Sequence, residues 1–503
     1  MISFVLSFLL LVVGYFVYGR IVEKIFAPDD RVCPSVKNAD GVDFIVLPKW
    51  KVFMIQFLNI AGTGPIFGSI MGMWFGPSAY LWIVFGCIFA GAVHDYLTGM
   101  ISMRQGGVSV PNIVGTYLGD SMRKVMMVFS VVLLILVGAV FVLTPATLLQ
   151  EMMPAGSAMK NLLIWISIIF VYYVIATMMP VDKIIGKIYP LFAFSLLFMA
   201  VALMVMLFIY RPALPEIWDG LGDMGAARLG INNEPIFPAL FITIACGALS
   251  GFHATQSPLM ARCVRHEKQG RQIFFGSMIT EGLVALVWAT ISSWFFFDEG
   301  WRTVCSPDII EQYTQSGLKV TQYFSAPKVV MYACNGWLGL IGGILAVFGV
   351  IAAPITSGDT ALRSARLIIA DYFKVSQKPI PNRLLICIPI FLVTIGLLVW
   401  QIDNPDSFNV IWKYFGWANQ TLAVCCLWAY TVYLAMRKRQ YLITLIPAIF
   451  MTMVCCSFFL ISRISLGMDV TLGYIISAIA TLLVTVLFFV WLSKNKGKEM
   501  LKD

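Results

Sequence analysis

The sequence predicts an all-α integral membrane protein with about thirteen spanning helices, each of the roughly 20 apolar residues that a bilayer requires. Of its 503 residues, 59% are hydrophobic and only 12% are charged, whereas about 25% of a soluble domain is charged. Helices suit this composition because a lipid-exposed backbone must satisfy its own hydrogen bonds. The net charge of +9 does not indicate nucleic-acid binding, because the basic residues lie in short loops between apolar stretches. A soluble enzyme and a disordered scaffold are excluded.

The expected spans are apolar stretches of sufficient length, with boundaries placed to about 2–4 residues. The first has no basic residues before it and no small-residue cleavage site after it, so we interpret it as a retained span and not a signal peptide. The spans cover residues 2–18, 52–73, 79–101, 125–144, 162–179, 188–210, 236–259, 273–297, 329–353, 384–400, 409–435, 442–461 and 471–491. The loops between them are short, which indicates one membrane domain.

The basic residues predict the orientation, because Lys and Arg accumulate in cytoplasmic loops. The loop at 19–51 is rich in them, so the N-terminus is expected outside. Residues 360–373 are short for a span and contain Arg363 and Arg366. We therefore expect them to form a cytoplasmic amphipathic helix, where a cysteine at position 364 would be labelled only from the inside. The C-terminus is then cytoplasmic.

Two spans contain Gly, Pro and hydroxyl residues in mid-membrane, at 59–68 and 247–258. One such cluster could be a simple kink, but two clusters five spans apart are typical of a transporter with inverted repeats and discontinuous helices. Half-helix ends would favour a carboxylate-bearing substrate at their N–H groups and a cation such as Na⁺ at their carbonyls. The residues expected at this substrate site are Asn59, Ala61, Gly62, Thr63, Gly64, Pro65, Ser250, Gly251, Phe252, Thr255 and Gln256. Leucine at Gly62 or Gly251 should abolish transport and leave expression largely intact.

The repeats would occupy residues 52–210 and 236–435 of a single transporter domain. Residues 1–51 would add an accessory first helix and a cytoplasmic loop, and residues 442–491 two accessory helices. Residues 492–503 would form a cytoplasmic tail.

Four ionisable residues lie inside spans, where charge is rare and usually functional. His94, Asp95, His253 and Glu281 all fall about 9–12 Å from the inner surface at 1.5 Å per residue. We expect them to approach one another. Three interpretations stay open: a buried polar network, a proton or Na⁺ site coupled to transport, and a bound Zn²⁺.

Two further groups have a structural and a functional interpretation. Thr356, Ser357 and Asp359 could complete a cation site with Asp95 and Glu281. Alternatively, Ser357, Asp359 and Thr360 could cap the helix that follows. Asn419 and Gln420 lie in apolar surroundings and must find partners. They are either interhelical contacts or, with Trp417, substrate contacts.

A membrane enzyme is the rival class, but its motifs are missing. The zinc-protease pattern His-Glu-x-x-His begins at His266 and fails at Gly270, and the sequence contains no Gly-x-Ser-x-Gly and no phosphate-binding loop. Transport driven by an ion gradient is therefore favoured over enzymatic activity.

Several motifs together resemble the carbon starvation protein A (CstA) family of bacterial transporters. They are AGTGP at 61–65, GAVHD at 91–95, GALSGFH at 247–253, TSGDTALRSAR at 356–366 and FGWANQ at 415–420. The resemblance implies a leucine-transporter-type fold of two five-helix inverted repeats, a bacterial inner-membrane location, and uptake of peptides or pyruvate during nutrient limitation. His94 and Trp417 depart from the family pattern, which often has Gln and a smaller residue there.

The sequence thus predicts a secondary transporter that imports short peptides or pyruvate with a proton or sodium gradient. The alternatives are an amino-acid carrier and a metal-dependent membrane enzyme. No cofactor is expected to be required, although a bound zinc or sodium ion stays an alternative. The expected partners are the small-molecule substrate and the lipid bilayer, with no nucleic acid.

Overall fold

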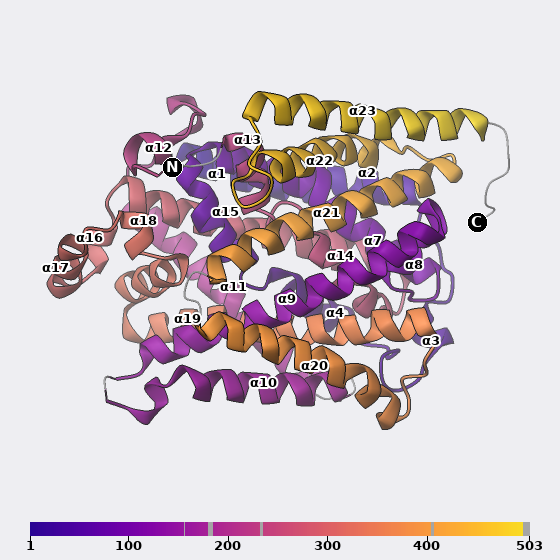
Figure 1. Ribbon diagram of the computed structural model, residues 1–503, viewed down its shortest axis with the longest axis horizontal. Helices are drawn as coiled ribbons and strands as arrows, with labels where there is room; N and C mark the ends of the chain where they lie inside the picture. Colours follow the sequence, from indigo (N-terminus) through magenta and orange to yellow (C-terminus); the bar gives the residue numbers. More distant parts are fainter. Residues whose placement is uncertain (155, 180–184, 232–234, 404–406, 496–503) are drawn as a thin grey trace.

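In the computed structural model the chain is helical, as predicted, and its long helices run side by side in one bundle (Figure 1). The structure describes residues 1–154, 156–179, 185–231, 235–403 and 407–495, so most of the tail expected at 492–503 lies outside the described residues. The first helix starts at one end of the bundle and the last described helix ends at the opposite end (Figure 1). An odd number of crossings, as in the predicted topology, gives this arrangement.

Eight helical segments of the described residues are long and apolar enough to cross a bilayer, and a bent pair, Lys49–Ala61 with Gly64–Phe75, gives a ninth. The other four predicted spans correspond to α10, the broken pair α13 and α14, α19 and α21. The main helices are α1 (Ile2–Phe16), α2 (Tyr18–Phe26), α4 (Lys49–Ala61), η1 (Gly64–Gly68), α5 (Ser69–Gly72), η2 (Met73–Phe75), α6 (Ser78–Leu81), η3 (Trp82–Gly91), α7 (Ala92–Arg104), α9 (Asp120–Met152), α10 (Leu162–Met178), α11 (Ile185–Tyr210), α13 (Ile236–Thr243), α14 (Gly251–Ala261), η7 (Arg271–Phe275), α15 (Gly276–Phe297), α19 (Ala326–Phe373), α20 (Ile380–Asp403), α21 (Ser407–Met436), α22 (Leu442–Ile461) and α23 (Val470–Lys494).

The remaining helices are short and lie in the connections. They are α3 (Pro34–Lys37), α8 (Val110–Leu118), η4 (Ala158–Lys160), η5 (Ile217–Asp219), α12 (Met224–Arg228), η6 (Glu267–Gln269), α16 (Trp301–Val304), α17 (Pro307–Ser316) and α18 (Val320–Tyr323).

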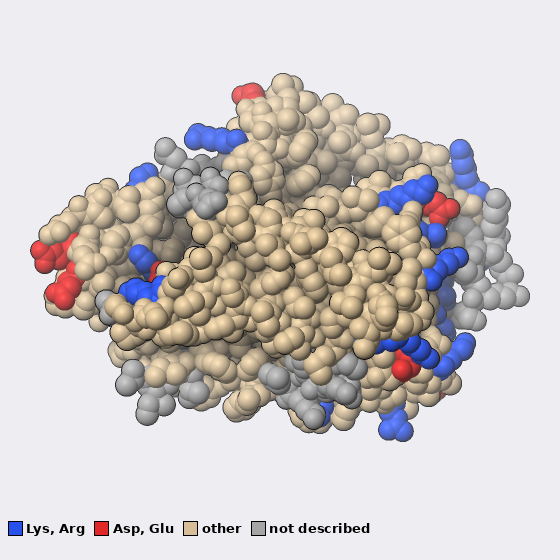
Figure 2. Space-filling model, turned by 60° about the horizontal axis from the view of Figure 1, so that its bottom comes forward, with Lys and Arg blue, Asp and Glu red and all other residues tan. Residues whose placement is uncertain are grey.

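The surface of the bundle fits a bilayer. Figure 2 shows a wide band without charged side chains across the visible face, with most of the basic side chains at one end and acidic and some basic side chains at the other. On the outer helix α23, Leu482, Leu483 and Leu487 are each more than half exposed. Large exposed apolar surfaces are unusual in soluble monomers, so these side chains contact lipid.

Both predicted breaks are present. Helix α4 ends at Gly62, whose φ of 41° and ψ of −144° are outside the helical region, and the span resumes in η1 after a bend of 52°. Helix α13 ends at Thr243, and the chain is non-helical until α14 begins after the extended Ser250. A helix that stops leaves its last carbonyls and first N–H groups without intrahelical partners, so both spans expose backbone polar groups inside the bundle.

The structure corrects the prediction for residues 360–373. They continue the ninth span as part of the 48-residue α19, whose backbone leaves helical geometry only at Gly339. Ser357, Asp359 and Thr360 consequently lie inside a helix and do not cap a helix start. Arg363 and Arg366 are fully buried and do not form the polar face of an amphipathic helix. Buried arginines persist there because loop and helix-end groups from elsewhere in the chain pair with them, as described below.

This correction moves the labelling test of topology. Ser364 is only 2% exposed, so Ser364→Cys should resist an impermeant maleimide from both sides of the membrane. Lys374 follows the end of α19 and is exposed, and Lys374→Cys should react only from the cytoplasmic side. The wild type serves as the background, because nine of its cysteines are buried and Cys425 and Cys456 are half-buried. Reaction of Lys374→Cys from outside would reverse the predicted orientation.

Candidate transport site and buried ionic cluster

The two broken spans meet at their breaks. A Cβ atom built on Gly64 would lie 2.4 Å from Cys246 Sγ, and one built on Gly68 would lie 2.9 Å from the carbonyl oxygen of Thr243. Pro65 packs close to Gly247, because a Cβ atom built on Gly247 would lie 3.7 Å from the Cβ of Pro65. The first break, from Ala61 to Pro65, therefore packs on the non-helical segment between α13 and α14. Glycine at position 64 allows this approach because any side chain there would overlap Cys246.

Four buried side chains near the breaks carry polar atoms without a hydrogen-bond partner among the described residues. Both amide atoms of Asn59, the hydroxyl of Thr63 and the side-chain carbonyl oxygens of Gln256 and Gln420 are in this state, and all four residues are fully buried. A buried polar atom left without a partner costs about 1–3 kcal/mol. A set of four around two helix breaks indicates groups that are kept for a ligand.

Other predicted contact residues are already paired within the protein. Asn419 on α21 accepts hydrogen bonds from the backbone N–H of Phe252 (2.5 Å) and from Ser250 Oγ (3.1 Å), so it caps the start of α14. Thr255 donates to the carbonyl of Phe252 at 2.6 Å. Trp417 points to α22, where its indole N–H donates to the carbonyl of Cys455 at 3.2 Å. The contacts of Asn419 and Trp417 join α21 to neighbouring helices, as in the alternative stated for Asn419, whereas that of Thr255 lies within α14.

Gly62 and Gly251 are both placed where a side chain would meet protein. A Cβ built on Gly62 would lie 3.0 Å from Phe141, and one built on Gly251 only 2.3 Å from the carbonyl oxygen of Asn419. Gly251 consequently provides close packing of α14 on α21.

The middle of α19 touches the first break. Ser357 Oγ donates to the carbonyl oxygen of Leu58 at 3.0 Å, and Leu58 belongs to the last turn of α4. Asp359, two residues further along and about half a turn around the helix, is buried and accepts hydrogen bonds from Tyr172 (2.8 Å) and Tyr189 (2.5 Å). The hydroxyl of Thr356 donates within its own helix, to Ala352 and Ala353, and its carbonyl oxygen accepts from Tyr189 at 2.9 Å. Of the three residues, Ser357 is the one that faces a half-helix carbonyl end.

The four ionisable residues at common depth are brought together. Asp95 bridges two imidazoles, with His94 Nδ1 at 2.8 Å and His253 Nδ1 at 2.9 Å. The other ring nitrogen of His253, Nε2, lies 3.3 Å from a carboxylate oxygen of Glu281. All four side chains are fully buried. The residues form a chain across α7, α14 and α15, in which His253 is the link between the two carboxylates.

A fifth residue, Cys246, belongs to the same neighbourhood and was not predicted. Its Sγ, a ring nitrogen of His253 and a carboxylate oxygen of Glu281 all lie within 4.8 Å of one another. Cys246 sits in the non-helical segment before α14, seven positions from His253. In the sequence it looks like one more apolar residue of a span, because only the break turns it toward the ionic cluster.

A second buried ionic group lies near the end of α19, and its acidic member could not be predicted from the sequence. Asp43, from the loop before α4, lies 3.5 Å from Arg363 Nη1 and 3.3 Å from Arg366 Nη2. Arg363 also donates to the carbonyl of Met179 at 2.8 Å. Burial alone would raise the pKa of Asp43, but the two guanidinium groups outweigh it and hold this pKa below its usual value.

Asp43→Asn should therefore destabilise the protein by about 3–5 kcal/mol, because it leaves two buried guanidinium charges without their carboxylate. A carboxyl whose folded pKa is lowered contributes stability above its unfolded pKa, near about 3.9, and loses it as pH falls through the folded value. Thermal unfolding in detergent should show wild type losing this contribution only below about pH 4. Asp43→Asn should show a lower Tm at pH 7 and less loss between pH 5 and 3; an unchanged Tm would contradict the pairing.

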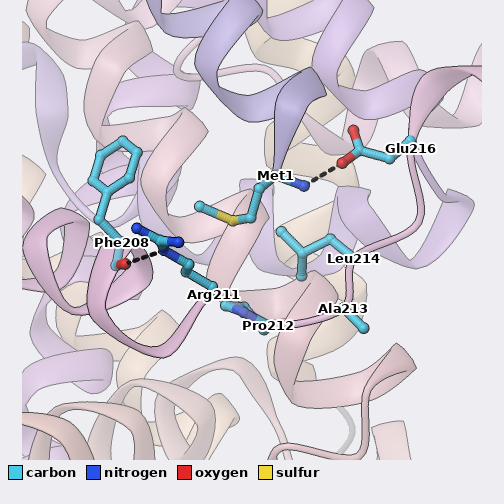
Figure 3. Close-up of a pocket in the computed structure, with 7 residues that line it drawn as sticks. All are labelled: Met1, Phe208, Arg211, Pro212, Ala213, Leu214 and Glu216. Carbon is cyan, nitrogen blue, oxygen red and sulfur yellow. Dashed lines mark hydrogen bonds and ion pairs between the residues drawn. The ribbon is translucent and has the colours of Figure 1, made fainter.

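A surface cavity of about 510 Å³ lies apart from these groups, lined by Met1, Phe208, Arg211, Pro212, Ala213, Leu214 and Glu216. Figure 3 shows Glu216 directed at the N-terminal amine, with Arg211 bonded to the carbonyl of Phe208. The cavity contains none of the predicted site residues. We therefore keep the helix breaks as the candidate transport site.

Comparison with solved structures identifies the fold. The chain superposes on a manganese transporter of Eremococcus coleocola with a TM-score of 0.55 at 11% identity, covering 91% of this chain and 98% of that one. It superposes on Mhp1, a nucleobase-cation-symport-1 family transporter, with a TM-score of 0.53 at 14% identity, covering 89% and 93%. The fold is thus that of the leucine-transporter type, in a protein with multiple apolar spans.

Sequence comparison then gives the family. Residues 1–170, 157–327 and 337–457 match the profile of the carbon starvation protein CstA, and the chain belongs to this family. The peptide transporter CstA of Bacillus subtilis is 24% identical over 99% of this chain and 97% of its own length. An uncharacterised membrane protein of Haemophilus influenzae is 44% identical over 57% of this chain and 89% of its own length.

Proposed function

We propose that this transporter imports short peptides in symport with a cation across the bacterial inner membrane, with its N-terminus outside and its C-terminus in the cytoplasm. The observation that carries the proposal is the set of unpaired polar atoms at the two breaks, on Asn59, Thr63, Gln256 and Gln420. The name of the Bacillus subtilis relative, peptide transporter CstA, supports the same substrate.

The chemistry of the unpaired atoms favours a peptide over pyruvate. Three of them are amide carbonyl oxygens, which accept hydrogen bonds, one is a hydroxyl, and one is the amide nitrogen of Asn59, which donates. A peptide offers an ammonium group and N–H groups to the acceptors and a carboxylate to the donors. Pyruvate has no donor and would leave the acceptors unpaired. All four side chains are buried, so on this proposal substrate entry requires the surrounding helices to part.

For the coupling ion we propose a site between the end of α4 and α19. The carbonyl end of a half-helix attracts a cation, and Ser357 contributes its hydroxyl next to the carbonyl of Leu58. Asp359, two residues after Ser357, is the one predicted carboxylate on this helix, and it accepts hydrogen bonds from Tyr172 and Tyr189. A sodium ion would bind between the Leu58 carbonyl and the Ser357 hydroxyl, whereas a proton would bind to the carboxylate of Asp359. The two cases differ in whether an imposed sodium gradient or an imposed proton gradient drives uptake.

Proteoliposomes separate these possibilities. We expect liposomes that contain the wild-type protein to accumulate labelled dipeptide against its concentration gradient when one of the two gradients, sodium or proton, is imposed. Empty liposomes should not accumulate it. An excess of a single amino acid or of pyruvate should compete only weakly. Pyruvate accumulation without dipeptide uptake would assign pyruvate as the substrate, and strong competition by single amino acids would favour the amino-acid carrier. Failure of both gradients to drive any accumulation would refute symport. Hydrolysis of the dipeptide without accumulation would favour the metal-dependent enzyme.

A further inference from the structure

The ionic cluster contains a three-residue ligand set that differs from the one predicted from sequence. Cys246 Sγ, His253 and Glu281 converge within 4.8 Å, whereas His94 is linked to this set only through Asp95. The three residues come from the non-helical segment at 244–250, from α14 and from α15. They therefore join the second helix break to a neighbouring spanning helix.

The polar atoms of this set are unsatisfied. Both carboxylate oxygens of Glu281 and the Nε2 atom of His253 are fully buried and have no hydrogen-bond partner among the described residues, although Nε2 and one oxygen lie 3.3 Å apart. A buried carboxylate needs a compensating charge and hydrogen bonds. A cation placed between these atoms supplies the charge and uses their lone pairs.

The distances suit a tetrahedral ion. Zn–N bonds of about 2.0–2.1 Å and Zn–O bonds of about 2.0–2.2 Å put tetrahedral N and O ligands about 3.3 Å apart, which is the observed separation of His253 Nε2 and Glu281. The thiolate of Cys246 would complete three protein ligands after a side-chain movement of about 1 Å, leaving a fourth position for water. A thiolate in the set selects Zn²⁺ over the hard cations Mg²⁺, Ca²⁺ and Mn²⁺.

The surrounding hydrogen bonds orient the ligands. His253 donates from Nδ1 to Asp95 at 2.9 Å, which leaves the lone pair of Nε2 directed at Glu281. A metal-bound imidazole almost always has such a partner on its second nitrogen, often a carboxylate. His94 in turn holds the other oxygen of Asp95 at 2.8 Å. Asp95 and His94 thus hold the imidazole of His253 through its Nδ1 atom, on the side away from Glu281, and do not contact the ion.

We propose that Cys246, His253 and Glu281 bind a resident Zn²⁺ ion, with Asp95 and His94 as positioning residues. The ion fixes the non-helical segment before α14 to α15. It lies beside the transport site, because Cys246 also packs on Gly64 of the first break. The site stands on its own geometry and does not depend on which substrate is carried.

The test is the metal content of purified protein, measured by mass spectrometry with an affinity tag free of histidine. Wild type should carry about one equivalent of zinc, as a single site requires. Cys246→Ser, His253→Ala and Glu281→Gln should each lose it. Cys334→Ser alters a buried cysteine on α19 and should keep it. His94→Ala should also keep the metal, and Asp95→Asn should weaken binding by about 10–100-fold.

Cobalt substitution tests the ligands even if a variant folds poorly. Wild type loaded with Co²⁺ should show a thiolate-to-cobalt charge-transfer band, and chelation should remove the band and lower the Tm. Zinc-free wild type that gains neither metal nor the band when Zn²⁺ or Co²⁺ is supplied would overturn the proposal. Retention of zinc by both Cys246→Ser and His253→Ala would overturn it too, and loss of zinc in His94→Ala as complete as in His253→Ala would overturn the assigned ligand set. None of these outcomes depends on peptide uptake, so the transport proposal stands or falls separately.

Discussion

Asn59→Leu is expected to reduce dipeptide uptake by at least about tenfold, the loss that corresponds to one ligand hydrogen bond worth about 1.4 kcal/mol or more. The same change should leave the Tm unchanged or higher. Both amide atoms of Asn59 are buried without a partner, and replacing unpaired polar atoms with an apolar group of similar shape removes a desolvation cost. Loss of uptake without loss of stability is the signature of a group reserved for the substrate.

Asn419→Leu is the matched control, because it makes the same substitution at a buried asparagine that is fully engaged. It removes the acceptor of the Phe252 N–H and of Ser250 Oγ, so it should lower stability by about 1–3 kcal/mol. Thr63→Val should resemble Asn59→Leu, since the hydroxyl of Thr63 is also unpaired. If Asn59→Leu transported normally, or if it unfolded as readily as Asn419→Leu, Asn59 would not be a substrate contact.

The breaks could be predicted from sequence because their signal is local. Glycine, proline and hydroxyl residues in the middle of an apolar stretch weaken a helix wherever it lies, and the structure ends α4 at Gly62 and restarts α14 after Ser250. The contacts among His94, Asp95, His253 and Glu281 could be anticipated from their common depth. The cost of isolated charge in a membrane makes such residues find one another.

Other features could not be predicted because their partners are distant in the chain. Asp43 lies in a loop more than 300 positions before Arg366, and nothing local marks it as the counter-ion of two buried arginines. If the pairing with Asp43 is not known, two arginines three positions apart on a helix indicate that this face of the helix is exposed to water. Pro354 and the cap-forming residues after it likewise favour a helix end, but burial of the continuous helix against its neighbours overrides these local preferences. The role of Cys246 could not be predicted for a similar reason. A cysteine in an apolar stretch of sequence cannot be told apart from one that only packs in the core.

Gly251→Ala is expected to destabilise the protein by about 1–3 kcal/mol or more, as overpacking of a tight contact does, and to reduce the yield of folded protein. The added Cβ would lie 2.3 Å from the carbonyl oxygen of Asn419 and 2.6 Å from the backbone nitrogen of Ala423, and backbone atoms of α21 cannot rotate away as a side chain can. By the same contact, leucine at this position should also lower the yield of folded protein, in contrast to the expectation from sequence. Gly396 on α20 has no heavy atom within 4 Å of its built Cβ, so Gly396→Ala should be neutral or stabilising by about 0.5–1 kcal/mol, the helix preference of alanine over glycine. Detergent-solubilised yield and Tm of the two variants measure the contrast. Equal stability of Gly251→Ala and Gly396→Ala would show that α14 does not pack on α21 as closely as the structure has it, and would remove the steric reason for glycine at the second break.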